Sequence, residues 1–197
     1  MKIIGDRVLI RPLELEDVFF MRNWGHHENP LMDDYNFPVL TDNQIKKWYR
    51  YKMNSLFSSY YGVENENQRL IGYMGIKRIR YILRKSTLGI VFDPSFVSKG
   101  YGTDALRAFL NHYFNEMKMK KMYLEVADYN YRAKKLYEKM GFTDAGYYLD
   151  EFHNQELDLS NKYYLKSKSS FVIDNKKIYN YIYWMELTKE NFMEIWR

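Results

Sequence analysis

Apolar residues recur along the chain with two spacings. Alternate apolar positions predict strands, and apolar positions every third or fourth residue predict helices. Residues 6–11 have the length and the branched side chains of a strand, which a proline ends. The acidic residues that follow predict the first turn of a helix that reaches Trp24. Thr41 and Gln44 have the spacing of a capping box, which predicts a second helix as far as Met53.

Four apolar segments in the middle of the chain predict strands. Residues 58–63 and 69–79 flank a polar turn, which is typical of an antiparallel hairpin. Residues 88–92 and 121–127 predict two more strands, with an amphipathic helix between them. The segment 25–40 contains prolines and follows neither period, so we expect a loop between the first two helices.

A loop with two glycines connects the strand at 88–92 to the helix behind it. Its sequence, Lys-Gly-Tyr-Gly-Thr at residues 99–103, leaves Gly100 and Gly102 without Cβ atoms, so that backbone N–H groups can approach an anion. The loop therefore predicts a pyrophosphate site. Through Ala105 the glycines also match the dinucleotide fingerprint, and a nicotinamide-binding Rossmann domain is the alternative. In a Rossmann unit the glycines follow the first strand almost directly, whereas several elements precede them here.

A second amphipathic helix follows the strand at 121–127. Asn130 is a candidate N-cap and Gly141 a candidate left-handed C-cap. The apolar residues between them have the spacing of one buried helix face: Ala133, Leu136, Tyr137 and Met140. This spacing predicts that the Tyr137 side chain points inward.

The two motifs, in this order and at this separation, resemble those of the GNAT superfamily of acetyl-CoA-dependent N-acetyltransferases. The resemblance covers residues 89–142 and includes Asn-x-x-Ala-x-x-Leu-Tyr-Glu-Lys-x-Gly-Phe at residues 130–142. The opening segment, 7–17, is similar to the ribosomal-protein-acetyltransferase-like branch. The resemblance implies an α/β (α+β) fold with a mixed, mostly antiparallel sheet of about seven strands, of which the fourth and fifth splay apart, and about four flanking helices. It also implies a single acetyltransferase domain over residues 1–197.

The resemblance names acetyl-CoA as the cosubstrate and implies which residues hold it. Backbone groups of Ile90, Val91 and Phe92 would pair with the pantetheine arm and polarise the thioester carbonyl. Asn130 and Ala133 would contact the cofactor arm. The glycine loop would cradle the pyrophosphate with Ser98, Lys99, Gly100, Tyr101, Gly102 and Thr103.

The same resemblance implies direct attack of a primary amine on the thioester in a ternary complex. Tyr137 matches the family tyrosine that protonates the departing thiolate, and Glu125 stands where some members carry a general base. From the residues alone, the simpler interpretation of Tyr137 is a core aromatic, and Glu125 is equally a carboxylate that faces solvent or a lysine. The family usually has Arg or Gln where this chain has Val97, so we expect altered coenzyme A binding. His26 and His27 lack the spacing of a metal site, and no metal is expected.

The acceptor is expected to be a cationic small molecule, a polyamine or an aminoglycoside, because acidic residues lie in the segments that would face the thioester. These candidates are Glu28, Asp33, Asp34, Asp150 and Glu151. A protein N-terminal acetyltransferase acting on a peptide N-terminus and a noncatalytic coenzyme A-binding module are the alternatives. We expect a closing hairpin at 146–152 and 179–187, with an insertion at 154–177 that acts as a lid, a homodimer contact or a mobile surface loop.

Composition narrows the function further. Of 197 residues, 46% are hydrophobic, which suffices for a packed core, and the absence of cysteine excludes a cysteine nucleophile and thiolate metal sites. The formal net charge of +5 is modest, so nucleic-acid binding through the basic stretch 77–85 and its Tyr81 is not expected. No apolar run is long enough for a membrane span and the start turns polar too soon for a signal peptide, which predicts a cytoplasmic protein without a membrane partner.

Overall fold

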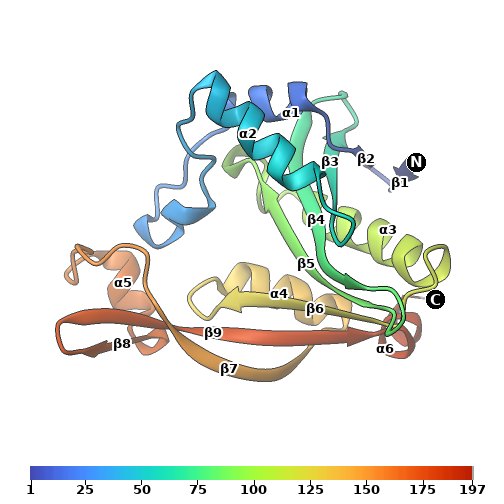
Figure 1. Cartoon of the computed structure of the whole chain (residues 1–197). Coiled ribbons are helices and arrows are strands. Elements are labelled where there is room, and N and C mark those ends of the chain that lie inside the picture. Colours follow the sequence, from blue (N-terminus) through green and yellow to red (C-terminus); the bar gives the residue numbers. More distant parts are fainter. Residues whose placement is uncertain (197) are drawn as a thin grey trace.

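The computed structural model describes residues 1–196, and the core of its fold is one twisted sheet with helices on both faces (Figure 1). The strand order is β1-β2-β3-β4-β5-β6-β9-β7, and β8 also pairs with β9. Every neighbouring pair is antiparallel except β5 and β6, which are parallel. The strands are β1 (Ile3–Ile4), β2 (Val8–Pro12), β3 (Ser59–Asn65), β4 (Leu70–Arg80), β5 (Lys85–Phe92), β6 (Lys121–Ala127), β7 (Thr143–Glu151), β8 (Phe171–Asp174) and β9 (Lys177–Thr188).

The longer helices cover opposite faces of the sheet. The helices are α1 (Leu15–Phe20), α2 (Asp42–Met53), α3 (Tyr101–Asn115), α4 (Tyr131–Met140), α5 (Lys162–Lys166) and α6 (Lys189–Ile195). Apolar side chains of α3 and α4, such as Phe109 and Met140, join the main core with residues of β2 to β6 and β9. On the other face α1 and α2 pack over β3 and β4 around Trp24 and Ile45. In this arrangement α4 lies next to β6, the strand that follows α3 along the chain.

The sheet opens between β5 and β6. These are the fourth and fifth of the seven expected strands once the short β1 and β8 are set aside, so the opening lies where the resemblance implies. The two strands pair only from Lys85 to Thr87, opposite 121–123, and no residue of Leu88–Phe92 has a partner on β6. Beyond Thr87, β5 continues along β4 while β6 continues along β9, so the two halves of the sheet diverge (Figure 1). Backbone N–H and C=O groups that face this opening are free to bind a ligand.

The local signals in the sequence set the helix ends as predicted. The Thr41 hydroxyl accepts a hydrogen bond from the Gln44 N–H, and the Gln44 side chain accepts one from the Thr41 N–H. The Asn130 side chain caps α4 by accepting from the Ala133 N–H. Gly141 ends that helix at φ +97°, a left-handed conformation that glycine adopts without strain.

Several predicted boundaries were wrong. The first helix ends at Phe20 and continues as a 3-10 turn, Met21–Asn23, while the segment 25–40 contains another such turn, Pro30–Tyr35. Pro12 belongs to β2, because it lies at the last paired position of the strand. β5 begins at Lys85, so the basic stretch 77–85 is the tip of a hairpin. The short elements β1, β8, α5 and α6 carry too few residues for a clear period and were not predicted.

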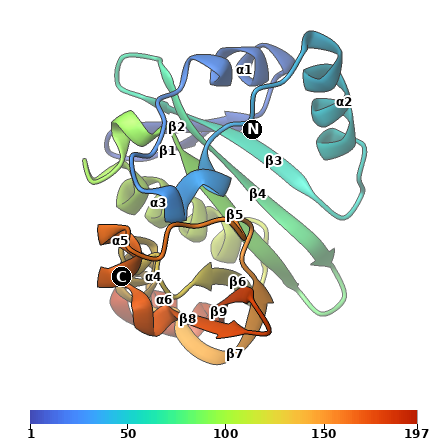
Figure 2. The ribbon, with the colours of Figure 1, turned by 90° about the vertical axis from the view of Figure 1, so that its left-hand side faces the viewer.

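The segment 154–177 is packed against the body of the protein rather than forming a mobile surface loop. Phe171 and Tyr164 from this segment join a second apolar cluster with Phe152. The turn Pro30–Tyr35 contributes Leu31 to the same cluster. In Figures 1 and 2 this turn lies next to α5, so the segment supports the wall of the opening between β5 and β6.

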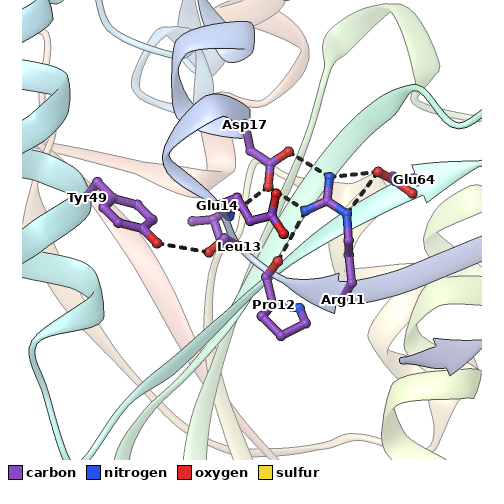
Figure 3. A network of polar contacts seen from close by, with 7 residues as sticks. All are labelled: Arg11, Pro12, Leu13, Glu14, Asp17, Tyr49 and Glu64. Carbon is purple, nitrogen blue, oxygen red and sulfur yellow. Dashed lines mark hydrogen bonds and ion pairs between the residues drawn. The ribbon is translucent and has the colours of Figure 1, made fainter. Parts of the chain in front are cut away.

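A network of charged groups joins the N-terminal elements (Figure 3). The Arg11 guanidinium donates to both carboxylate oxygens of Asp17, over 2.6 and 2.7 Å, and to Glu64 Oε1 over 2.9 and 2.6 Å. Asp17 also accepts from the Glu14 N–H at the start of α1. The network therefore fixes α1 against β2 and β3. Its carboxylates raise the pKa of Arg11, with the Asp17 hydrogen bond as the largest cause.

Candidate active site

A cavity of about 380 Å³ lies at the opening between β5 and β6. Its lining comes from Leu88–Phe92 on one side and from Glu125 and Val126 on the other. The first turn of α3 and the inner face of α4 complete the wall, and the 3-10 turn Pro30–Tyr35 contributes Met32 and Tyr35. The cavity is the place where a ligand could bridge the two halves of the sheet.

The cavity brings together most of the residues that the sequence implied for the cofactor. These are Ile90, Val91, Phe92, Ser98, Gly100, Gly102, Thr103, Asn130, Ala133 and Tyr137. Gly100 precedes α3 with φ +88°, and a Cβ on Gly102 would lie 3.1 Å from Leu136 Cδ2, so both positions favour glycine. The first N–H groups of α3 have no partner within the helix, and Gly100, Gly102 and Thr103 line the cavity at this end of the helix, so an anion there would be stabilised. Val97 also lines the cavity, so the departure from the family pattern lies at the site itself.

Two residues of the glycine loop do not line the cavity. The buried Tyr101 ring lies under the Arg7 guanidinium, at 4.3 Å, and its hydroxyl donates to Glu66. Arg7 also donates to the Lys99 carbonyl over 2.9 Å. Arg7 and Glu66 therefore support the loop on the side away from the cavity. No local pattern indicated this role, because the two residues lie far from the loop along the chain.

Tyr137 points inward, as the helix period predicted, and lines the deep part of the cavity. Its ring packs edge-on against Phe142, with 5.8 Å between centroids. Burial raises the pKa of Tyr137, and the nearby Tyr35 adds to this shift. The phenol therefore keeps its proton at neutral pH and can donate it.

Tyr35 is a cavity residue that the sequence did not reveal. It follows two aspartates in a segment without periodicity, and only the fold brings it beside α4. Burial raises the pKa of Tyr35, and a hydrogen bond with the Asn130 side chain opposes this shift. Tyr35, Asn130 and Tyr137 thus form one polar group on the wall nearest α4.

Glu125 lines the cavity from β6, and its side chain is 39% exposed. The only charged group paired with it among the described residues is Arg78, whose Nη1 lies 4.0 Å from Oε1. A carboxylate at this place can accept a proton from a nucleophile that approaches the open end of β5. This position agrees with the sequence expectation for a general base, which stays a prediction.

The five acidic candidates for the acceptor site do not line the cavity, and all of them are exposed at the surface. Glu151 pairs with Lys177 over 2.9 Å. Asp34 lies 3.9 Å from His153; burial raises the pKa of Asp34, and the histidine opposes this shift. Asp150 lies on the same face of the sheet as Glu125, and Asp33 and Glu28 lie in the segment before α2.

Basic residues line the cavity instead, and the sequence did not single them out. Lys52 from the last turn of α2 and Lys77 from β4 face the open side, while His27 and Arg132 lie nearer α4. Burial lowers the pKa of Lys52, and the positive charge of Lys77 lowers it further. The alternation of β4 places Lys77 on the same face as Tyr73, a signal that was available in the sequence.

The described residues contain no group of three or more side chains that could hold a metal ion. Nor does any helix within residues 1–196 have the length and apolar character needed to cross a membrane.

Comparison with known proteins relates the chain to acetyltransferases. Residues 7–143 match the family model described as an acetyltransferase (GNAT) domain. The spermidine N(1)-acetyltransferase of Vibrio cholerae is 26% identical over 167 residues, which cover 84% of this chain and 96% of that protein. The enzyme of the same name from Escherichia coli is 23% identical over 145 residues, covering 74% and 77% of the two chains.

Solved structures of spermidine N-acetyltransferases share the fold of this chain. A crystal structure of the Vibrio cholerae spermidine N-acetyltransferase in complex with CoA and spermine has a TM-score of 0.70, with 22% identity over 94% of this chain and 98% of that chain. A dodecameric structure of the enzyme, in an intermediate state, has a TM-score of 0.66, with 21% identity over 94% and 96%.

Proposed function

The chain belongs to the GNAT family of acetyltransferases, and on this premise we propose that it moves the acetyl group of acetyl-CoA to a primary amine of a polyamine. The transfer is direct, in a ternary complex. The observation that carries the proposal is the cavity between β5 and β6, which has free strand edges, a glycine loop at one end and Tyr137 at depth.

Acetyl-CoA fits the residues on the α3 and α4 side of the cavity. The pyrophosphate binds at the N-terminus of α3, where Gly100 and Gly102 allow close approach to backbone N–H groups. The pantetheine arm extends along the unpaired edge of Ile90 and Val91 as an additional strand would. The same edge offers N–H groups to the thioester oxygen, which gains negative charge during attack.

The amine loses a proton before or during attack. An alkylammonium has a pKa of about 10 in water, so at neutral pH most of the acceptor arrives protonated. Glu125 accepts this proton, directly or through a water molecule, because it is the one carboxylate among the residues that line the cavity. The free amine then attacks the thioester carbon.

Tyr137 completes the reaction as the proton donor to the departing thiolate. Its raised pKa keeps the phenol neutral, and its burial among Tyr35 and Phe142 excludes bulk water from the leaving group. The C–S bond breaks as the C–N bond forms, and the thiolate leaves as coenzyme A with the proton from Tyr137. The second proton of the attacking nitrogen restores the Tyr137 phenol, and Glu125 releases the first proton to water, so that both groups return to their starting state. No covalent enzyme intermediate is required.

A polyamine is the proposed acceptor class, because the relatives that match most of the chain are named for acetylation of spermidine. An aminoglycoside or a peptide N-terminus is chemically able to react at the same place, and these compounds are the competing acceptors in the test.

The test is release of free thiol from acetyl-CoA with a panel of amines: spermidine, spermine, an aminoglycoside, amino acids and a peptide with a free N-terminus. The protein adds no thiol background because it has no cysteine. Turnover that is fastest with spermidine or spermine is the expected result. Turnover confined to a peptide or an aminoglycoside would overturn the acceptor class, and binding of coenzyme A without any turnover would favour a noncatalytic module.

We further propose that the whole chain acts as one acetyltransferase domain that associates with copies of itself. β9 comes late in the sequence yet lies between β6 and β7, so the C-terminal third is part of the same sheet.

β7 is an edge strand whose nine residues are all exposed, and such an edge can pair with another chain. Light scattering coupled to size exclusion should give a mass of two or more chains, and a monomer at micromolar concentration would contradict this proposal.

A further inference from the structure

The face of β6, β9 and β7 that carries Glu125 also bears exposed aromatic and acidic side chains outside the cavity, while Asn180 on the same face is buried. We propose that this surface binds the acceptor beyond its reacting nitrogen: Trp184, Tyr148 and Asp150 hold the distal ammonium, and Glu125, at the inner end of the surface, faces the reacting nitrogen. The inference rests on the proposed function, since it assigns the part of the polyamine that does not react. These four residues are called the ammonium face below.

The strand register puts the four residues on one side of the sheet. Glu125 on β6 lies directly opposite Trp184 on β9. Trp184 shares its face with Ile182 and Asn180, because alternate residues of a strand point the same way. Tyr148 lies opposite Ile182 and Asp150 lies opposite Asn180, so both β7 residues point to the same side.

The side chains of the ammonium face lie near one another and remain accessible. Tyr148 is 41% exposed and Trp184 is 44% exposed. Partial burial raises the pKa of Tyr148, and the negative charges of Glu125 and Asp150 add to the shift, whereas Arg78 opposes it. The Tyr148 hydroxyl therefore lies in the field of both carboxylates, between the cavity and the outer end of β7.

Such a surface suits an organic cation. An ammonium over the face of an exposed Trp or Tyr is attracted by the negative face of the ring, and neighbouring carboxylates add to this attraction. Arg78 already lies 4.0 Å from Glu125 and shows that this place accommodates a positive charge. Its side chain is 73% exposed, so an incoming ammonium displaces a solvated group rather than a buried one.

Positive charges on the opposite wall of the cavity repel a polycation. Lys52 and Lys77 line that wall, and each would repel a second ammonium on the substrate. A monoamine has no such second charge. With its reacting nitrogen near Glu125, a polyamine therefore lowers its electrostatic energy by extending along the ammonium face and away from the two lysines.

The test compares Asp150→Asn with Asp144→Asn, using spermidine and 1-butylamine as acceptors. Asp144 is also on β7, but it points to the opposite side of the sheet, where it lies 3.5 Å from Lys134. Asp150→Asn should raise the KM for spermidine about 5- to 10-fold and leave both kcat and the KM for butylamine within about 2-fold. Asp144→Asn should change neither KM.

A second variant keeps the test decisive if the Tyr148 ring holds the distal ammonium in the absence of the Asp150 charge. Tyr148→Leu combined with Asp150→Asn should raise the KM for spermidine further, again without an equal change for butylamine. Equal changes for the two amines, or none for spermidine, would overturn the ammonium face while leaving the acetyltransferase activity intact. A wild-type chain that acetylates no amine would instead overturn the proposed function.

Discussion

Burial of Tyr137 fixes the orientation of its side chain and also raises its pKa. The side chain is 8% exposed and its ring packs against Phe142. Replacing it with phenylalanine keeps these apolar contacts and removes only the proton donor. Tyr137→Phe should lower kcat about 100-fold while the Kd for acetyl-CoA stays unchanged, as measured by steady-state kinetics and a binding titration. Full turnover in this variant would exclude Tyr137 as the acid.

The pH dependence of catalysis follows from the same side chain. The pKa of Tyr137 is raised in the folded protein above its unfolded value of about 10. The stability that its neutral form contributes is therefore present below pH 10 and is lost as the pH rises through the folded pKa. We expect no loss of kcat from deprotonation of Tyr137 between pH 7 and about 9.5. A decline in that range in the wild type, absent from Tyr137→Phe, would show that the pKa is not raised.

The positive charge of Lys77 repels a cationic acceptor in the cavity. Lys77 lines the open side of the cavity beside Lys52, whose pKa is lowered by burial and lowered further by the positive charge of Lys77. Lys77→Gln should lower the KM for spermidine about 2- to 5-fold, because a repulsion across the cavity is removed. The expected change for 1-butylamine is smaller. A higher KM for spermidine in the variant would mean that Lys77 assists rather than repels the acceptor.

Single residues were predictable where a local motif defined them. The helix period indicated the inward direction of Tyr137, and the capping pattern indicated Asn130. Tyr35 and Lys52 were not predictable, because they reach the cavity only after the segments before β3 fold over the sheet. The acidic residues before α2 remain at the surface, since charge in a sequence does not tell which side of a segment will face a site.

The contacts between elements depend strongly on Arg11, which joins β2 to α1 and β3 (Figure 3). Asp17 is only 8% exposed and Glu64 14%, so removal of the guanidinium would leave two carboxylates poorly solvated. Arg11→Met should lower the free energy of unfolding by about 3 kcal/mol, as measured by urea denaturation.

Arg22→Met is the matched control for this prediction. Arg22 also pairs with an aspartate, Asp42, over 2.6 Å, but Asp42 is 68% exposed. An exposed pair contributes about 0–1 kcal/mol, so the control should change little. Equal losses in the two variants would contradict the network as the support of α1.

At the level of elements, the sequence predicted the parts that carry strong local signals. The hairpin of β3 and β4, the strand β6 and the helices α2, α3 and α4 were expected from period and capping. A closing hairpin at 146–152 and 179–187 was expected, and β7 does pair with β9, but nothing in the sequence indicated that β9 would lie between β6 and β7. The segment 154–177 was expected as an insertion, but its packing against the turn Pro30–Tyr35 depends on long-range apolar contacts that a single sequence does not reveal.

For the whole molecule, the opening of the sheet couples ligand binding to the free energy of unfolding. A cofactor in the cavity would contact both halves of the sheet, at β5 and at β6, and would bind only the folded chain. Acetyl-CoA at about 100 times its Kd should add about 2.7 kcal/mol to the free energy of unfolding and raise Tm by about 5 to 10 °C. Thermal denaturation followed by fluorescence measures this shift. NADH should give none, and a larger shift with NADH would favour the dinucleotide alternative.

The most direct test of acetyl transfer to a polyamine is mass analysis of spermidine after incubation with acetyl-CoA and the purified chain, with coenzyme A measured in the same sample. We expect acetylated spermidine and free coenzyme A in equal amounts, formed at a rate that depends on both substrates. Coenzyme A released without acetylated spermidine, or no release with any amine, would contradict acetyl transfer to a polyamine.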